Sequence, residues 1–226
     1  MSDQRQKVRI LMSEFVTHDV KRFIVTKPEG FEFTPGQGVE VAINSPDWQD
    51  EGRPFTPTGL PDDRVLEFTI KKYPDHNGVT EQLHSLESGS ELLLADVFGT
   101  IKYKGPGVFI AAGAGITPFL AIIRDQARQG SLGGSSLLFS NKTAADIIAE
   151  KELRFHFGDQ AIFTCTEEET TSSQYQRQYI DKAFLQAHID RFDQPFYVCG
   201  PPGFMESVND ALEALGADPD SLVFEN

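Results

Sequence analysis

The fold class of this chain is most clearly indicated by residues 105–129, GPGVFIAAGAGITPFLAIIRDQARQ. This stretch joins a short apolar run, a glycine-rich turn and a segment whose apolar residues recur with helical spacing. Gly113 and Gly115 permit positive φ angles and a close approach of a ligand to the backbone. The helix that begins near Pro118 would direct free N–H groups at the same space. The stretch therefore predicts a strand–turn–helix unit with an anion site at its turn, and a glycine-rich turn without a ligand is the alternative.

The rest of the C-terminal half continues this alternation of strands and helices. The expected strands are 105–112, 135–140, 160–168, 195–200 and 221–226, and the expected helices are 119–129, 145–157, 179–189 and 203–216. Strands that alternate with helices predict an α/β domain with a doubly wound parallel sheet. The polar, low-complexity segment 167–178 predicts a mobile loop.

The N-terminal half has a different pattern, in which short alternating segments are separated by turn residues. The expected strands are 7–16, 20–28, 36–44, 64–73 and 91–99, with one short helix over 79–87. Strands with such frequent turn signals predict an antiparallel β-barrel. The sequence therefore predicts a barrel domain over 1–104 and an α/β domain over 105–226.

Composition argues against several classes of protein. The formal net charge of −14 predicts that the chain binds neither nucleic acid nor an anionic membrane. Two cysteines are too few for a disulfide framework or an iron–sulfur cluster, which favours a reducing, cytoplasmic location. The five histidines show no paired spacing, so no metal site is expected. No run of apolar residues is long enough to span a membrane, and residues 1–10 show no signal-peptide core.

Two stretches of the N-terminal half could hold a cofactor. RPFTPTG, residues 53–59, places a cation, an aromatic ring and a hydroxyl on a loop stiffened by proline, which suits a ligand with a phosphate and a flat ring. A plain surface turn is the alternative. In HNGVTEQL, residues 76–83, Gly78 and Thr80 stand at the start of a predicted helix. They indicate either a second anion site or a simple helix cap.

A third stretch, YVCGPPGF at residues 197–204, ends a predicted strand and turns into a helix. Ligands of open parallel sheets bind beyond the carboxyl ends of the strands, so Cys199 would project into that crevice. The alternative is a small buried thiol that packs as an inert apolar group.

Taken in order, these stretches resemble the motifs of the ferredoxin–NADP reductase superfamily. RPFT resembles the family's RxYS/T flavin motif, FTPGQGVEV its PGQ strand, and NGVT its GxxS/T phosphate segment. GAGITP and CGPPGF resemble its two nicotinamide-dinucleotide motifs. The five motifs occur in the family's order and cover nearly the whole chain.

The resemblance implies a role for each matching position. The implied flavin-binding positions are Arg53, Pro54, Phe55, Thr56, Gly78, Val79 and Thr80, and the implied dinucleotide-binding positions are Gly113, Gly115, Thr117, Gly200 and Pro201. Arg53 would pair with the flavin phosphate, and Phe55, where the family usually has Tyr, would cover the flavin ring. Thr56, Cys199 and Glu225 are the catalytic candidates, with Thr56 near the flavin N5 and Cys199 near the reactive carbon of the nicotinamide.

The implied activity is hydride transfer from NAD(P)H to bound flavin, followed by electron transfer to a separate acceptor such as a flavodoxin, a ferredoxin or a cytochrome. The resemblance favours FAD over FMN. SNKTAADI, residues 140–147, resembles NADH-dependent cytochrome reductases, so NADH is favoured over NADPH. The chain departs from the family because no aromatic residue follows Glu225, which could equally be a solvated terminal carboxylate. A free-flavin reductase and a non-catalytic electron-transfer or regulatory subunit remain alternatives.

Overall fold

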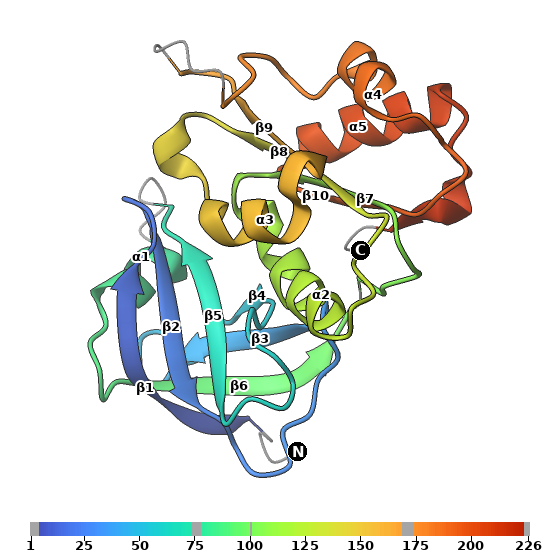
Figure 1. Ribbon diagram of the computed structural model, residues 1–226. Helices are drawn as coiled ribbons and strands as arrows, with labels where there is room; N and C mark the ends of the chain where they lie inside the picture. Colours follow the sequence, from blue (N-terminus) through green and yellow to red (C-terminus); the bar gives the residue numbers. More distant parts are fainter. Residues whose placement is uncertain (1–4, 74–77, 100, 169–173, 224–226) are drawn as a thin grey trace.

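The computed structural model of the protein describes residues 5–73, 78–99, 101–168 and 174–223. Within these ranges the chain forms one sheet of six strands and one of five. Figure 1 shows the two sheets in separate halves of the molecule, with helix α2 (Thr117–Arg128) between them. None of the helices within the described ranges is long and apolar enough to cross a membrane.

The N-terminal sheet is antiparallel, in the order β4-β3-β6-β1-β2-β5. Its strands are β1 (Gln6–Phe15), β2 (Val20–Thr26), β3 (Gly38–Ile43), β4 (Arg53–Phe55), β5 (Val65–Lys71) and β6 (Glu91–Phe98). An antiparallel bridge between Pro57 and Phe68 joins the chain just after β4 to β5, which stand at the two ends of this order. The sheet therefore closes on itself, and the predicted antiparallel barrel is confirmed.

The barrel strands form because every second side chain meets a common core. In β1, Val8 and Ile10 are buried while the residues between and before them are exposed. Val79, the first residue of helix α1 (Val79–Ser85), is buried in the same core. α1 is thus held to the barrel by its apolar side.

Strand β4 corrects the expectation that residues 53–59 form a loop. Phe55 pairs with Val39 and Arg53 with Val41, so the first part of this stretch belongs to the sheet. Pro54 is tolerated there because β4 stands at the end of the strand order, where a missing N–H is least costly. Three strand residues around a proline show no alternation, so this pairing has no local signal in the sequence.

The C-terminal sheet is parallel, in the order β11-β10-β7-β8-β9. Its strands are β7 (Val108–Ala112), β8 (Ser136–Asn141), β9 (Ala161–Cys165), β10 (Phe196–Cys199) and β11 (Leu222–Val223). The helices that follow β8, β9 and β10 are α3 (Glu150–Phe157), α4 (Lys182–His188) and α5 (Pro202–Ala214). The predicted doubly wound α/β architecture is confirmed.

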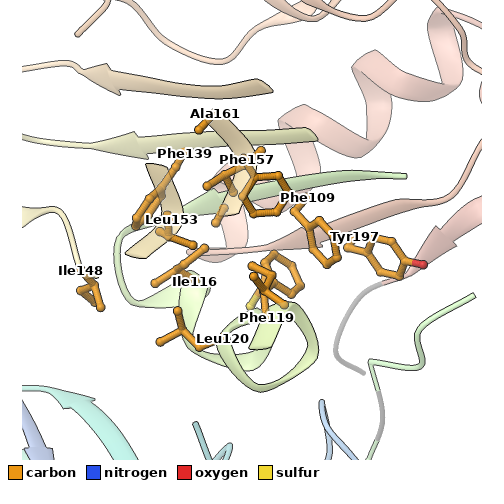
Figure 2. Packing of buried hydrophobic residues seen from close by; sticks show 14 of the residues in the cluster. Phe109, Ile116, Phe119, Leu120, Phe139, Ile148, Leu153, Phe157, Ala161 and Tyr197 are labelled. Carbon is orange, nitrogen blue, oxygen red and sulfur yellow. The ribbon is translucent and has the colours of Figure 1, made fainter. Parts of the chain in front are cut away.

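Each face of the parallel sheet has its own core. Phe109 of β7 packs with Phe119 of α2 and Phe157 of α3 on one face, and Figure 2 shows this cluster together with Tyr197. Ile110, the next residue of β7, belongs to the cluster on the other face, which α4 and α5 cover. Apolar residues at consecutive positions are typical of a strand buried on both sides.

The predicted helix over 145–157 is divided in two. A 3₁₀ turn over Ala144–Asp146 is closed by a capping box, in which Thr143 and Asp146 bond each other's backbone N–H. α3 begins only at Glu150, because Ala149 has a φ of 55° and interrupts the helical backbone. The apolar spacing of this segment predicts helix, but the predicted continuity over 145–157 is wrong because the backbone breaks at Ala149.

We propose that the domain boundary lies between Lys104 and Gly105, in the connection from β6 to β7. Tyr197, in the middle of β10, holds this connection with its hydroxyl group. The hydroxyl accepts a hydrogen bond from the Lys104 N–H at 2.8 Å and donates one to the Gly105 carbonyl at 2.7 Å. Burial raises the pKa of Tyr197 to about 12, so the hydroxyl keeps its proton at neutral pH.

Candidate functional site

A single cavity of about 1010 Å³ is lined by residues of both halves. The barrel contributes Pro54, Phe55, Thr56, Thr69, Ile70, Lys71, Tyr73 and Thr80. The α/β half contributes the turns after β7, β8 and β10, including Gly113, Gly115, Thr117, Asn141, Lys142, Cys199, Gly200 and Pro201. The cavity therefore lies at the carboxyl ends of the parallel strands and faces the β4 segment of the barrel.

On the barrel side, the structure brings most of the predicted flavin positions to the cavity. Phe55 is half-buried and packs against the barrel core, so its ring is held from behind. Thr56 is buried and lines the wall next to it. The Thr80 hydroxyl also lines the cavity and accepts a hydrogen bond from the Tyr73 N–H at 3.3 Å.

Three predicted positions stand apart from the cavity wall. The exposed Arg53 guanidinium donates to the Gly52 carbonyl at 2.8 Å and to Glu51 at 3.3 Å. Gly78 is the N-cap of α1, and the Val79 side chain points into the barrel core. Neither is part of the wall, so their predicted phosphate contacts would have to come from the backbone. Glu225 lies outside the described residues.

On the α/β side, the two glycines of GAGITP serve different purposes. Gly113 has a φ of 52°, and a Cβ atom there would meet nothing within 4 Å. At Gly115, by contrast, a Cβ atom would lie 2.3 Å from the Cys199 carbonyl oxygen. The expectation of positive φ and an open approach therefore holds for Gly113, whereas Gly115 is needed for close packing of the turn against β10. Thr117 begins α2 and donates its hydroxyl proton to the Ala114 carbonyl at 2.9 Å.

Cys199 is the last residue of β10 and pairs with Ala111 of β7 in the parallel ladder. It is buried, yet it lines the cavity together with Gly200 and Pro201, as the crevice rule predicts. The close approach of the Gly115 turn fixes its backbone position. Its role in hydride transfer stays a prediction.

Sequence reasoning missed several residues of the cavity, of which Asn141 is the most informative. Asn141 ends β8 and is 5% exposed, and neither polar atom of its amide has a hydrogen-bond partner among the residues that the structure describes. The rule that ligands bind at the carboxyl ends of parallel strands could have found it. Lys71 and Tyr73 also line the wall, but only the tertiary structure reveals them, because Lys71 ends the barrel strand β5 and Tyr73 follows it, where no local motif stands.

Replacing Asn141 with Leu is expected to raise the free energy of unfolding by about 1 kcal/mol. The reason is that a buried amide without partners loses its hydrogen bonds to water on folding, and an apolar group of similar size does not. Denaturant titration would measure the change. Asn209→Leu is the control on α5, where the oxygen is the one amide atom that is buried without a partner in the described structure, so a smaller gain is expected. A loss of stability at Asn141 would show that its amide is satisfied, for example by water.

The described residues contain one group of metal-binding side chains close enough to share an ion, namely His18, Asp19 and Asp146. His18 Nε2 lies 3.7 Å from Asp19 and 3.8 Å from Asp146. Asp19 is also paired with Lys71 at 2.9 Å, and Asp146 accepts two bonds from Thr143. These contacts occupy the carboxylates, so we interpret the group as polar contacts, of which the one between His18 and Asp146 joins the barrel to the α/β half.

Comparisons with known proteins agree with this architecture. Residues 109–210 match the family model of the oxidoreductase NAD-binding domain. Over 96% of its length, the chain is 26% identical to the naphthalene 1,2-dioxygenase system ferredoxin–NAD(P)(+) reductase component of Pseudomonas putida, of which it covers 67%. It is 27% identical to NADH-cytochrome b5 reductase 2 of Rattus norvegicus, with 75% of each chain covered. A ferredoxin NADP+ reductase from Neisseria gonorrhoeae, solved with bound FAD and NADP, superimposes with a TM-score of 0.82 at 18% identity over 99% of this chain and 98% of that one.

Along most of its length the chain is similar to reductases of the ferredoxin–NADP reductase type, and residues 109–210 match the oxidoreductase NAD-binding domain. It spans between 42% and 75% of the length of eight curated relatives that it matches, so it corresponds to part of those proteins. Within this fold, the β4 segment and the turns after β7, β8 and β10 meet at the cavity.

Proposed function

We propose that this chain is an NAD(P)H-dependent flavoprotein reductase, which takes a hydride from NAD(P)H onto bound FAD and passes electrons to a separate acceptor. One observation carries the proposal. Residues from the motifs of both halves, far apart in the sequence, line one continuous cavity. Its volume of about 1010 Å³ is at the upper end of the usual range for cofactor sites, as two large cofactors require.

The residues of the cavity fit these cofactors. Phe55 offers a supported aromatic face, and Thr56 offers a hydroxyl beside it. Gly113 leaves open space at the N-terminal end of α2, where backbone N–H groups favour an anion such as a pyrophosphate. FAD, when bound, supplies the ring that accepts a hydride and releases electrons singly. The protein's part is to hold the two rings in register and to exclude water.

We further propose that NADH is the preferred donor. Lys142 is the one cation that the turn after β8 brings to the cavity within the described chain. It is paired with Glu167 at 3.4 Å. Glu168 lies beside it and accepts a hydrogen bond from the Ala144 N–H at 2.8 Å. These carboxylates oppose the extra 2′-phosphate of NADPH, which one partly neutralised Lys cannot offset.

Replacing Glu167 with Gln is expected to raise the ratio of kcat/KM for NADPH to kcat/KM for NADH about twofold to fivefold. The pair is exposed, and an exposed ion pair contributes up to about 1 kcal/mol. Steady-state kinetics with both donors and an artificial acceptor would give the ratio. Glu213→Gln, an exposed carboxylate on α5, serves as the charge-matched control and should leave the ratio unchanged. An unchanged ratio in Glu167→Gln as well would exclude Glu167 from donor selection.

For the electron acceptor we propose only a class of protein. The relatives' names include a ferredoxin reductase component and a cytochrome b5 reductase, which supports a separate electron-transfer protein as the acceptor. The cytoplasmic location expected from the sequence stays a prediction that rests on cysteine usage, since neither Cys165 nor Cys199 forms a disulfide.

The test of the proposed function is the visible spectrum of the purified protein, recorded before and after anaerobic addition of NADH. Flavin absorption that bleaches with NADH is the expected result. Flavin bands that persist with NADH but bleach with NADPH would show that NADPH is the preferred donor. Bands that persist with both would indicate a non-catalytic subunit. A protein that retains no flavin, yet oxidises NADH when free flavin is added, would be a free-flavin reductase.

A further inference from the structure

Arg124 joins the two halves of the molecule directly behind the cavity. It lies on α2, and its side chain is 21% exposed. Its Nε and Nη2 atoms donate to the two carboxylate oxygens of Glu152 on α3, at 2.6 and 2.9 Å. Its Nη1 atom crosses to the barrel, where it donates to the Thr58 carbonyl and to Glu67 Oε1, both at 2.6 Å. One guanidinium therefore makes four hydrogen bonds, two to each half.

The barrel end of this cluster is continuous with the flavin motif. Thr58 is fully buried and stands two residues after Thr56 in RPFTPTG. Its hydroxyl donates to Glu67 Oε1 at 2.7 Å and lies 3.2 Å from the hydroxyl of Thr69. Both Thr56 and Thr69 line the cavity. A displacement of the cluster would therefore move the cavity wall on the barrel side.

The other end of the cluster is continuous with the dinucleotide motif. α2 begins at Thr117, which lines the cavity, and Arg124 follows seven residues later, about two helical turns along the same helix. A helix of this length bends little, so a shift at one end moves the other. The 3₁₀ turn that leads into it, Gly113–Ile116, packs against the backbone of Cys199 through Gly115. Arg124 thus connects the two motif segments through one rigid helix.

The electrostatics show a cluster that is mutually neutralised. Burial alone would raise the pKa of Glu152, but the hydrogen bonds and charge of Arg124 outweigh it and hold that pKa below its ordinary value. The two carboxylates outnumber the Arg124 guanidinium by one charge, and Arg22, which approaches Glu67 from the barrel at 3.9 Å, supplies the second positive charge that balances them. By comparison, the other ion pair from α2 to the barrel, Arg128 with Asp62, has side chains that are 47% and 67% exposed.

We propose that Arg124 is a positioning residue, which sets the distance between the flavin-motif segment and the dinucleotide-motif helix and so aligns the two rings for hydride transfer. This inference rests on the proposed function for its catalytic consequence. Its structural content, that Arg124 fixes how the halves are placed, is independent of any cofactor.

The main test replaces Arg124 with Lys. Lys keeps the positive charge but lacks the planar guanidinium whose several N–H groups bond both halves at once. We expect the rate constant of flavin reduction at saturating NADH, followed in single turnover by rapid mixing, to fall about tenfold or more. The flavin content and the dissociation constant of NAD+ should change by less than about twofold, because no residue of the cavity wall is altered. Arg128→Lys, the same substitution one turn further along α2, should leave all three quantities unchanged.

A second measurement does not depend on activity. Spin labels at Glu87→Cys in the barrel and Glu213→Cys on α5 stand on exposed positions of the two halves. Both native cysteines are buried, and burial, with nearby carboxylates, raises the pKa of Cys165 to about 11, which disfavours its labelling. We expect a single narrow distance distribution in the labelled parent, a broader one with Arg124→Lys, and the parent distribution with Arg128→Lys.

The outcomes separate this inference from the proposed function. An unbroadened distance distribution together with an unchanged reduction rate in Arg124→Lys would overturn the positioning role and leave the reductase intact. A parent protein that NADH and NADPH both fail to reduce would overturn the function, while the distance measurement would still decide whether Arg124 places the halves. Slow reduction with a tenfold weaker NAD+ affinity would assign Arg124 to binding and contradict the proposal.

Discussion

Replacing Gly115 with Ala is expected to lower the free energy of unfolding by about 3 kcal/mol. The new Cβ atom would lie 2.3 Å from the carbonyl oxygen and 2.5 Å from the carbonyl carbon of Cys199, and 2.7 Å from the Gly200 nitrogen. These are all backbone atoms, so no side chain can rotate away and the turn must move off β10. Urea titration followed by circular dichroism would measure the loss, and NAD+ affinity should fall with it because the turn lines the cavity.

Two other glycines provide matched controls for this result. Gly203→Ala adds the same methyl group in the first turn of α5, where nothing lies within 4 Å, so stability should stay the same or rise slightly. Gly113→Ala meets no atoms but forces a φ of 52° on Ala, at a cost of about 1 to 2 kcal/mol. If Gly115→Ala proved as stable as Gly203→Ala, the close packing of the turn on β10 would not exist in solution.

Replacing Arg53 with Ala is expected to weaken flavin retention about tenfold to a hundredfold. The family motif predicts that Arg53 pairs with the flavin phosphate, and a charge-assisted hydrogen bond contributes about 1.5 to 3 kcal/mol. In the structure its guanidinium is exposed and bonded to Glu51 at 3.3 Å, so it is available on the surface next to the cavity-lining Pro54. Ultrafiltration of the purified protein with defined FAD concentrations would give the dissociation constant.

Glu51→Gln is the control for Arg53, with an effect of the opposite sign. Removing the carboxylate releases the guanidinium from its partner, and FAD should then bind as tightly as before or slightly tighter. Because the Arg53–Glu51 pair is exposed, that gain should stay below about fivefold. Equal FAD affinity in the parent and in Arg53→Ala would remove Arg53 from the site and leave the flavin phosphate to other donors.

Much of this architecture could be predicted because it depends on local sequence patterns, namely the spacing of apolar residues and the positions of glycine and proline. Strands buried on both faces, such as Val108–Ala112, are continuous apolar runs, whereas barrel strands such as β1 alternate apolar and polar residues. The sequence of each half therefore indicates its fold class. The glycine-rich turn after β7 and the CGPPG turn after β10 could be placed at the cavity because parallel strands end at one edge of a sheet.

Three other features could not be predicted from the sequence, and the physical reason differs for each. β4 is too short to show an alternation of apolar and polar residues, and it is recognised as a strand only by its pairing with β3. The break at Ala149 interrupts a segment whose apolar spacing is helical throughout. Gly115 was assigned to ligand approach, whereas the atom that excludes a side chain there belongs to Cys199, more than eighty residues later in the chain.

Local sequence patterns are enough to predict that a barrel precedes a doubly wound α/β half and which motif residues stand at the turns. These features follow from the period of apolar residues and from the chemistry of glycine and proline. The packing of the two halves, by contrast, brings motif residues into one cavity and lets Arg124 bind Thr58, Glu67 and Glu152 at once. Those partners are 66, 57 and 28 residues away from Arg124. No local pattern specifies such contacts, because they form when two separately folded surfaces pack and bury a charge that must find its partners there.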